Sequence, residues 1–155
     1  MKNEAELRHL SFVIRHSSFV IRHTSFVIRE KGESEMVDYK DLPAWRLSRA
    51  LVSDIYLLTK NFPEDERFGL TNQIRRAVVS IPSNIAEGYN RRSDKEFAHF
   101  LKIAKGSAAE VETQLILSFD LGYITTKESE MFLKAVDDII RILGALITKT
   151  EAKYQ

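Results

Sequence analysis

Apolar residues recur at spacings of three and four from residue 37 onward, which is the period of an amphipathic α-helix. Helix-ending signals such as Asn61-Phe62-Pro63 separate the apolar stripes, and Pro43 is tolerated in the first turn of the first one. We expect four helices, over about 41–60, 71–87, 93–121 and 125–147. The fold class predicted is all-α, an antiparallel up-and-down four-helix bundle.

A proline interrupts the second of these helices. Pro82 removes one hydrogen bond and crowds the carbonyl of Val78, but the apolar stripe keeps its phase across it. We therefore expect a kinked helix, with Gly88 as its C-terminal stop. Ser83 and Asn84 follow the proline, and we expect them to satisfy the carbonyl freed at Val78; a polar lining at a subunit interface is the alternative.

The last two helices begin with the spacing of a capping box, at 93–96 and at 125–128. Gly122 ends the third helix. Within that helix, residues 115–119 place apolar side chains in several directions, and one buried helix face cannot accommodate all of them. Self-association would bury the remaining apolar surface. Residues 106–109 are small, and we interpret them as a close helix crossing.

The first 35 residues are a different kind of sequence. Residues 11–31 hold three near-copies of a seven-residue unit that fits neither a coiled-coil seam nor one face of a strand. We interpret 1–35 as a repetitive low-complexity leader, disordered or not translated natively, with translation beginning at Met36 and the bundle domain spanning 36–155. The rival interpretation is an arm that touches RNA or membrane through its basic residues, Arg15, Arg22 and Arg29.

Composition excludes several classes of function. The chain has no cysteine, so it has no disulfide framework, thiolate nucleophile or cysteine-ligated metal, and a cytoplasmic location fits. Charged residues interrupt every apolar run before the roughly 18 to 20 residues that a membrane span needs. The balance of 23 Lys+Arg against 22 Asp+Glu argues against a uniformly basic nucleic-acid coat, although an average hides local surfaces.

The run Ser80-Ile81-Pro82-Ser83-Asn84-Ile85-Ala86-Glu87-Gly88, preceded by Gln73-Ile74-Arg75-Arg76-Ala77, resembles the signature of the proteins encoded in intervening sequences of bacterial 23S rRNA genes. Residues 97–101, 106–114 and 121–124 also resemble that family. The resemblance implies a four-helix bundle that assembles into a ring, typically a homopentamer. It also implies kinship with the accessory variability determinant protein of diversity-generating retroelements, whose basic surface contacts RNA and reverse transcriptase. The family has no catalytic residue set to transfer.

Basic residues are concentrated between Thr71 and Gly106, and Tyr89 lies among them as a ring on which a base can stack. Because the second and third helices form a hairpin, we expect these charges to converge on one nucleic-acid-binding surface, with a solvated charged face as the alternative. The predicted binding residues are Arg75, Arg76, Arg91, Arg92, Lys95, Lys102 and Lys105.

Glu96-Phe97-Ala98-His99 has the spacing of a di-iron ligand pair, but His99 is the only histidine after residue 35, so the second pair is missing. We expect no metal or cofactor and place His99 on the polar side, and we expect Trp45 to anchor the core or an interface. The sequence thus favours a non-enzymatic, self-associating bundle whose partners are itself and a structured RNA or a reverse transcriptase, with no membrane partner. A protein-interaction scaffold without nucleic-acid binding is the alternative, and an enzyme ranks third.

Overall fold

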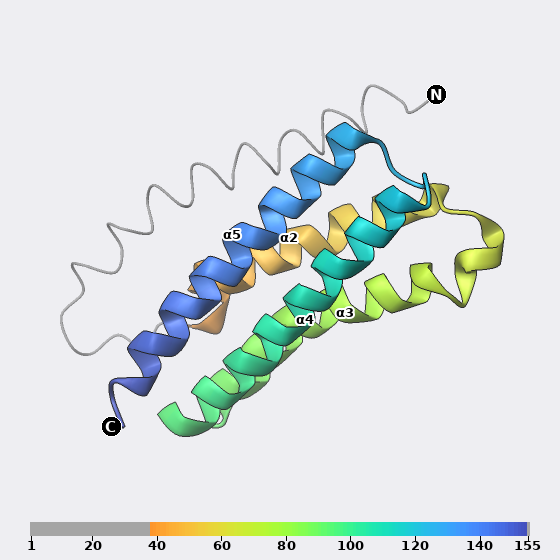
Figure 1. The fold of residues 1–155 in the computed structure, drawn as a ribbon. Coiled ribbons are helices and arrows are strands. Elements are labelled where there is room, and N and C mark those ends of the chain that lie inside the picture. Colours follow the sequence, from red (N-terminus) through yellow and green to blue (C-terminus); the bar gives the residue numbers. More distant parts are fainter. Residues whose placement is uncertain (1–37, 155) are drawn as a thin grey trace.

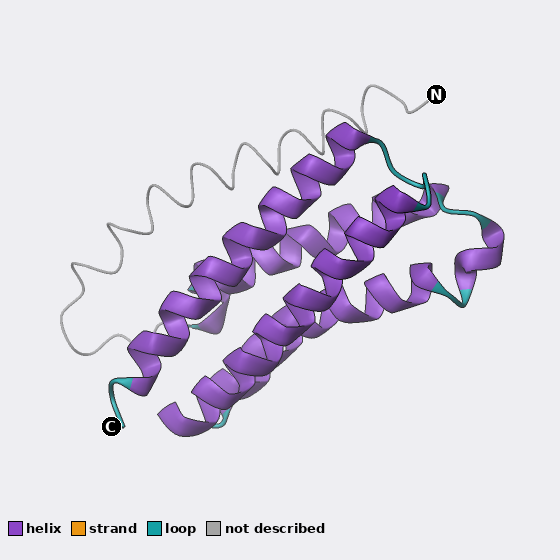
Figure 2. Cartoon of the chain, in the orientation of Figure 1, coloured by secondary structure: helices purple, strands orange, loops and turns teal. Residues whose placement is uncertain are grey.

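The computed structural model describes residues 38–154, and all regular structure within them is helical (Figure 2). The expectations for 1–35 lie outside the described residues. The elements in chain order are η1 (Tyr39–Asp41), α2 (Pro43–Leu58), η2 (Thr59–Asn61), η3 (Glu64–Arg67), α3 (Leu70–Asn90), α4 (Asp94–Asp120) and α5 (Thr126–Glu151). The predicted all-α four-helix fold is therefore confirmed.

The four long helices run antiparallel to their neighbours in sequence (Figure 1). Helix α3 packs extensively on α4 and α2, and α4 on α5, whereas α2 packs only lightly on α5. One end of the bundle, the α3–α4 end, holds the turn after α3 together with the start of α2 and the finish of α5. The opposite end, the α4–α5 end, holds the turn after α4 and the η3 segment.

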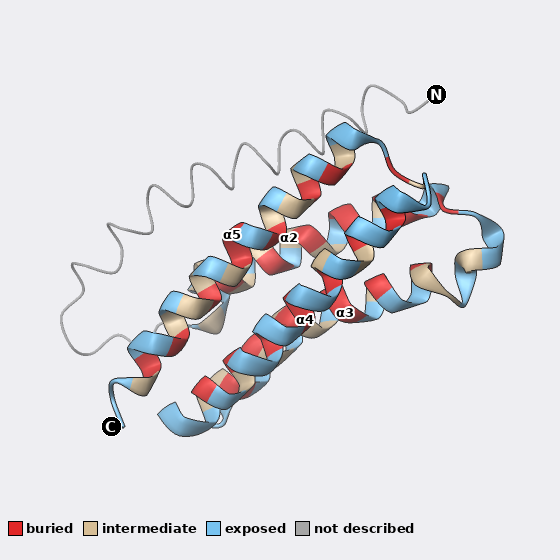
Figure 3. Cartoon of the chain, viewed as in Figure 1, coloured by how far each residue is buried: buried red, intermediate tan, exposed pale blue. Residues whose placement is uncertain are grey.

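The core consists of the apolar stripes that the periodicity predicts (Figure 3). Ile55, Ile74, Leu115 and Leu143 are among its fully buried side chains. Not all apolar residues of α4 enter this core, because Ile116, Leu117 and Phe119 keep 45%, 45% and 42% of their surface exposed. None of the helices in the described part of the chain is long and apolar enough to cross a lipid bilayer.

Helix α3 continues through Pro82, as expected, but the residues after the proline do not satisfy the carbonyl of Val78. Ser83 Oγ donates to the carbonyl of Val79 at 2.8 Å, and Asn84 Nδ2 donates to that of Ser80, also at 2.8 Å. The expectation was wrong because these side chains reach the carbonyl four residues back, which is one or two positions beyond Val78.

Gly88 and Gly106 do not have the roles that were expected of them. Gly88 does not stop α3, which runs to Asn90; a Cβ at Gly88 would lie 2.4 Å from Cβ of Phe100, so the missing side chain permits close packing on α4. Gly106 was expected at a helix crossing, but a Cβ there would meet no atom within 4 Å. Other residues of the predicted crossing do face α3, because Ser107 and Ala108 are buried and Ser107 Oγ hydrogen-bonds to Ser80 Oγ of α3 at 2.9 Å.

The two predicted capping boxes differ. Thr125 and Glu128 form the complete reciprocal pair at the start of α5, as expected. At the start of α4 the Ser93 hydroxyl accepts from the amide of Glu96 at 3.4 Å, but the return bond of the box is not formed within the described residues. Gly122, with φ 73°, ends α4 as predicted.

Candidate nucleic-acid interface

The seven basic residues predicted from the sequence lie on different sides of the bundle. Arg75 faces α2, where its Nε donates to Thr59 Oγ1 at 2.8 Å. Arg76 is exposed on α3, and it lines a depression between α3 and α4 together with Glu110. At 1.5 Å per residue, about 22 Å of helix axis separates Arg76 from Arg91.

The two later lysines of the predicted set point toward the last helix. Lys102 Nζ lies 2.7 Å from Glu151 Oε1, and this hydrogen bond raises the pKa of Lys102. Lys105 Nζ lies next to Gly144 of α5, 3.7 Å from the point that a Cβ would occupy if Gly144 carried a side chain. Since Arg75 faces α2 and these lysines face α5, the expectation that all seven charges converge on one surface was wrong.

Three of the predicted residues do gather at the α3–α4 end. Arg91 forms an ion pair with Glu87 at 2.7 Å and lies 5.4 Å from the centre of the Phe100 ring. Arg92 and Lys95 are exposed and form no ion pair within residues 38–154. Arg92 has a φ of 54°, the only non-glycine residue with positive φ in the same range.

The start of α2 supplies further cations to this end, which sequence reasoning missed. Lys40, Arg46 and Arg49 lie at the start of the bundle, and the Tyr39 ring, beside them, lies 6.1 Å from that of Tyr89 at the end of α3. More than 40 residues of sequence separate the two groups. The signal that would have found them is the antiparallel topology, because it places the start of one helix beside the finish of the next.

Charge is segregated along the bundle axis. When each long helix is divided at its middle, the α3–α4 half comprises residues 38–50, 80–107 and 139–154 and carries 11 Lys+Arg against 6 Asp+Glu. The other half of the described chain carries 6 against 11. The neutral domain therefore has one half with a net charge of +5 and another with −5. The cations of the basic half are Lys40, Arg46, Arg49, Arg91, Arg92, Lys95, Lys102, Lys105, Arg141, Lys149 and Lys153.

Half-buried aromatic rings lie among these cations. The ring of Tyr39 is 5.5 Å from Trp45 and 6.1 Å from Tyr89, and Tyr89 is 5.8 Å from Phe97. Guanidinium and ammonium groups cover part of the cluster, with Arg49 5.7 Å from the Trp45 ring and Lys40 5.5 Å from that of Tyr39. Cations interleaved with rings are the combination that binds phosphates and stacks bases. Trp45 is thus partly buried in this cluster, against the core.

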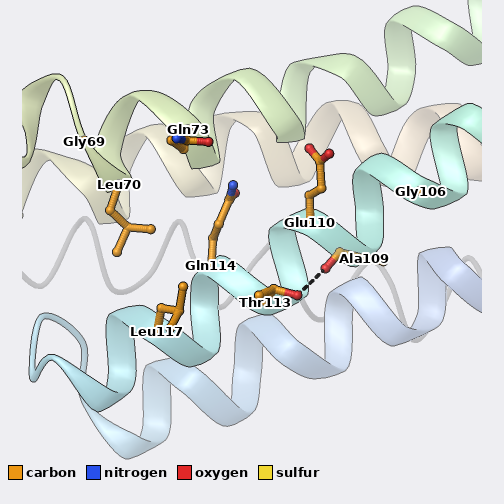
Figure 4. A pocket seen from close by; sticks show the side chains of 9 residues that line it. All are labelled: Gly69, Leu70, Gln73, Gly106, Ala109, Glu110, Thr113, Gln114 and Leu117. Carbon is orange, nitrogen blue, oxygen red and sulfur yellow. Dashed lines mark hydrogen bonds between the residues drawn. The ribbon is translucent and has the colours of Figure 1, made fainter.

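A separate groove of about 570 Å³ lies between α3 and α4 toward the α4–α5 end (Figure 4). Leu70 and Leu117 flank one part of it, and the side chains of Gln73, Gln114 and Glu110 extend along the rest. No Lys or Arg is among the groove's lining residues in the described chain. The groove therefore does not suit a phosphate ligand.

His99 is exposed on α4, as expected, and its ring packs edge-on against Phe100 at 5.6 Å. Residues 38–154 contain no cluster of three or more His, Asp or Glu able to hold a metal ion. The chemistry that the structure concentrates is therefore positive charge and aromatic surface at the α3–α4 end.

Comparison with known proteins relates the chain to one protein family and to a solved structure. The model of the 23S rRNA-intervening sequence protein family matches residues 40–145. A crystal structure of a protein of unknown function from the S23 ribosomal protein family of Bacteroides thetaiotaomicron VPI-5482 is similar, with a TM-score of 0.64 and 29% sequence identity. The match covers 70% of this chain and 98% of that one. No curated protein sequence matches the chain.

Proposed function

Since the chain belongs to the 23S rRNA-intervening sequence protein family, we propose that it is a non-enzymatic, self-associating bundle of the bacterial cytoplasm that binds RNA or a ribonucleoprotein through its α3–α4 end. The observation that carries the proposal is the segregation of +5 and −5 along a neutral domain. A polyanion that approaches such a molecule is attracted to one end and repelled from the other.

The aromatic cluster favours a nucleic acid over other polyanions. Phosphate contacts from Lys and Arg supply affinity that depends on salt, and rings supply stacking surface for bases. Both features occur together at the α3–α4 end, where Tyr39, Trp45 and Tyr89 lie beside Lys40 and Arg49. An RNA bound there would release counterions from several phosphates.

Self-association is supported by the apolar surface at the other end. Phe68 is 83% exposed, and Leu117 and Leu121 are 45% and 55% exposed on the last turns of α4 and just beyond. A second copy of the chain that covers these residues would remove apolar surface from water, which favours association. This contact leaves the α3–α4 end open, so an oligomer, for which the resemblance implies a pentamer, presents several basic ends at once. Light-scattering mass would be reduced toward the monomer by Leu117→Glu, while an unchanged mass would reject this contact.

The RNA proposal is tested by a matched pair of charge reversals. Arg92→Glu with Lys95→Glu removes two cations that form no ion pair within residues 38–154 from the α3–α4 end. Lys127→Glu with Lys134→Glu makes the same change of net charge on exposed residues of the other half. Filter binding of a structured RNA across a salt series should show a salt slope that is shallower by about 2 for the first pair and unchanged for the second.

The control pair separates local from global electrostatics. Equal losses in both variants would mean that only net charge matters, and no binding by the wild-type protein would reject RNA as the partner. The alternative function, an interaction scaffold such as an accessory subunit for a reverse transcriptase, predicts that a protein partner is retained by the Arg92→Glu, Lys95→Glu variant. Co-purification of that partner in high salt distinguishes the two functions.

A further inference from the structure

The outer surface of α2 and α3 carries positive charge of its own. On α2 and η2, one exposed stripe with spacings of four, three and four residues holds Arg49, Ser53, Tyr56 and Lys60. The neighbouring stripe of α3 presents Arg75 beside it. The only acidic side chain of α2 and η2 is Asp54, which is 4% exposed and belongs to the interior. We call the surface formed by Trp45 and these five residues the α2–α3 face.

Two ring–guanidinium pairs mark this face. Arg49 lies 5.7 Å from the centre of the Trp45 ring, and Arg75 lies 4.8 Å from that of Tyr56. The two rings are 11 residues apart on α2, which is about 16 Å along its axis. The face begins at the α3–α4 end, so it continues the basic, aromatic surface described above along the side of the bundle.

The second pair is held in place before any ligand arrives. Arg75 Nε donates to Thr59 Oγ1 at 2.8 Å, and Thr59 Oγ1 donates in turn to the carbonyl of Ile55 at 2.8 Å. The guanidinium therefore lies over Tyr56 while 41% of the Tyr56 surface remains exposed. A group fixed in this way loses less conformational entropy on binding than a free surface side chain.

We propose that the α2–α3 face is a track for single-stranded RNA that continues from the α3–α4 end, with unpaired bases stacking at Trp45 and Tyr56 and phosphates contacting Arg49, Lys60 and Arg75. This assignment rests on the proposed RNA function. A duplex keeps its bases stacked on one another, so it gains nothing from the two rings, whereas splayed bases of a single strand use both.

Trp45 makes the test direct because it is the only tryptophan in the chain. A 15-nucleotide oligouridine and a 15-base-pair RNA duplex are titrated into the full chain, with Trp45 fluorescence as the readout for both. The single strand should quench the fluorescence and bind more tightly than the duplex. Tyr56→Ala should weaken the single strand by about tenfold, the effect expected of one stacked base. Ile103→Ala, which shortens an apolar side chain of α4 that is 40% exposed and lies outside the surface proposed for self-association, should change neither affinity.

A charge-preserving variant separates stacking from electrostatics. Arg75→Lys keeps the positive charge but loses the planar group over Tyr56, so the track predicts several-fold weaker binding of the single strand and simple charge attraction predicts none. Circular dichroism confirms that each variant is folded.

The outcomes distinguish the two proposals. If Arg92→Glu with Lys95→Glu weakens RNA binding while Tyr56→Ala and Arg75→Lys do not, the track is rejected and the basic end stands. Polyglutamate that competes as well as oligouridine would also reject the track. If the wild-type protein binds neither RNA, both proposals fail.

Discussion

The turns at the two ends of the bundle each contain one residue in the left-handed conformation, but the residue differs between them. After α3 the left-handed residue is Arg92, with φ 54°, and after α4 it is Gly122, with φ 73°. Glycine adopts this region without a steric penalty, whereas an L-residue with a Cβ costs about 1 to 2 kcal/mol there. The α3–α4 turn therefore keeps an arginine where glycine would be more stable.

The two turns also differ in how completely the adjoining helix ends are capped by hydrogen bonds. The turn after α4 is a Schellman motif, in which the amides of Gly122 and Tyr123 donate to Phe119 and Ser118 at 2.9 Å, and it continues into the complete capping box of Thr125. The turn after α3 leads into a helix with one long cap bond, of 3.4 Å. The α3–α4 turn is therefore the more strained and the less completely capped of the two, and its left-handed residue is an exposed cation of the basic end.

The largest expected effect concerns the packing just before the α3–α4 turn. Gly88→Ala places a Cβ 2.4 Å from Cβ of Phe100, so it should lower the free energy of unfolding by about 1–3 kcal/mol. Gly106→Ala is the matched control, because nothing lies within 4 Å of its Cβ, and it should raise that free energy by about 0.5–1 kcal/mol. Urea denaturation measures both. Equal effects would show that α3 and α4 are not closely packed at Gly88.

Substitution of the left-handed residue should change the free energy of unfolding in opposite directions at the two turns. Arg92→Gly should stabilise the fold by up to about 1 kcal/mol, and Gly122→Ala should destabilise it by about 1 kcal/mol. Arg92→Gly should also weaken RNA binding, because it removes a cation from the basic end. A variant with Arg92→Gly that is less stable than the wild type would contradict the comparison of the turns.

Deletion of the cap hydroxyls should show the difference between the two helix starts. Thr125→Ala should cost about 1 kcal/mol because it removes a reciprocal box, and Ser93→Ala should cost about 0.5 kcal/mol because it removes a single long bond. Thermal unfolding of the two variants, measured side by side, gives the ranking. The reverse ranking would mean that the α3–α4 turn is the better capped of the two.

The smallest effect is a pH dependence at the α4–α5 end. Tyr123 OH donates to Glu66 Oε1 at 3.0 Å, which raises the pKa of Tyr123, with burial contributing in the same direction. The folded state therefore holds the phenol proton more tightly than the unfolded state does. The contribution of this hydrogen bond to the free energy of unfolding is complete below about pH 10, and it is lost as the pH rises through the raised pKa of Tyr123. The gap in urea midpoint between wild type and Tyr123→Phe should shrink from pH 8 to pH 10.5; a constant gap would contradict the coupling.

The four helices, their order and most of their core follow from the apolar pattern alone, because a stripe of apolar residues at helical spacing has few other ways to be buried. The start of α5 at Thr125 and the end of α4 at Gly122 were also predictable, since each depends on residues within one turn of the helix. The roles of Gly88 and Gly106 were not predictable, because what a Cβ would meet depends on the neighbouring helix.

The distribution of charge over the surface depends on how the helices pack. The sequence identified basic residues between Thr71 and Gly106, but helix phase places Arg75 toward α2 and Lys102 toward α5. Antiparallel packing then brings the start of α2 beside the finish of α3 and adds Arg49 to the α3–α4 end. A local count of charges cannot show this, because the direction of a side chain and the identity of its neighbours are set by how the helices pack.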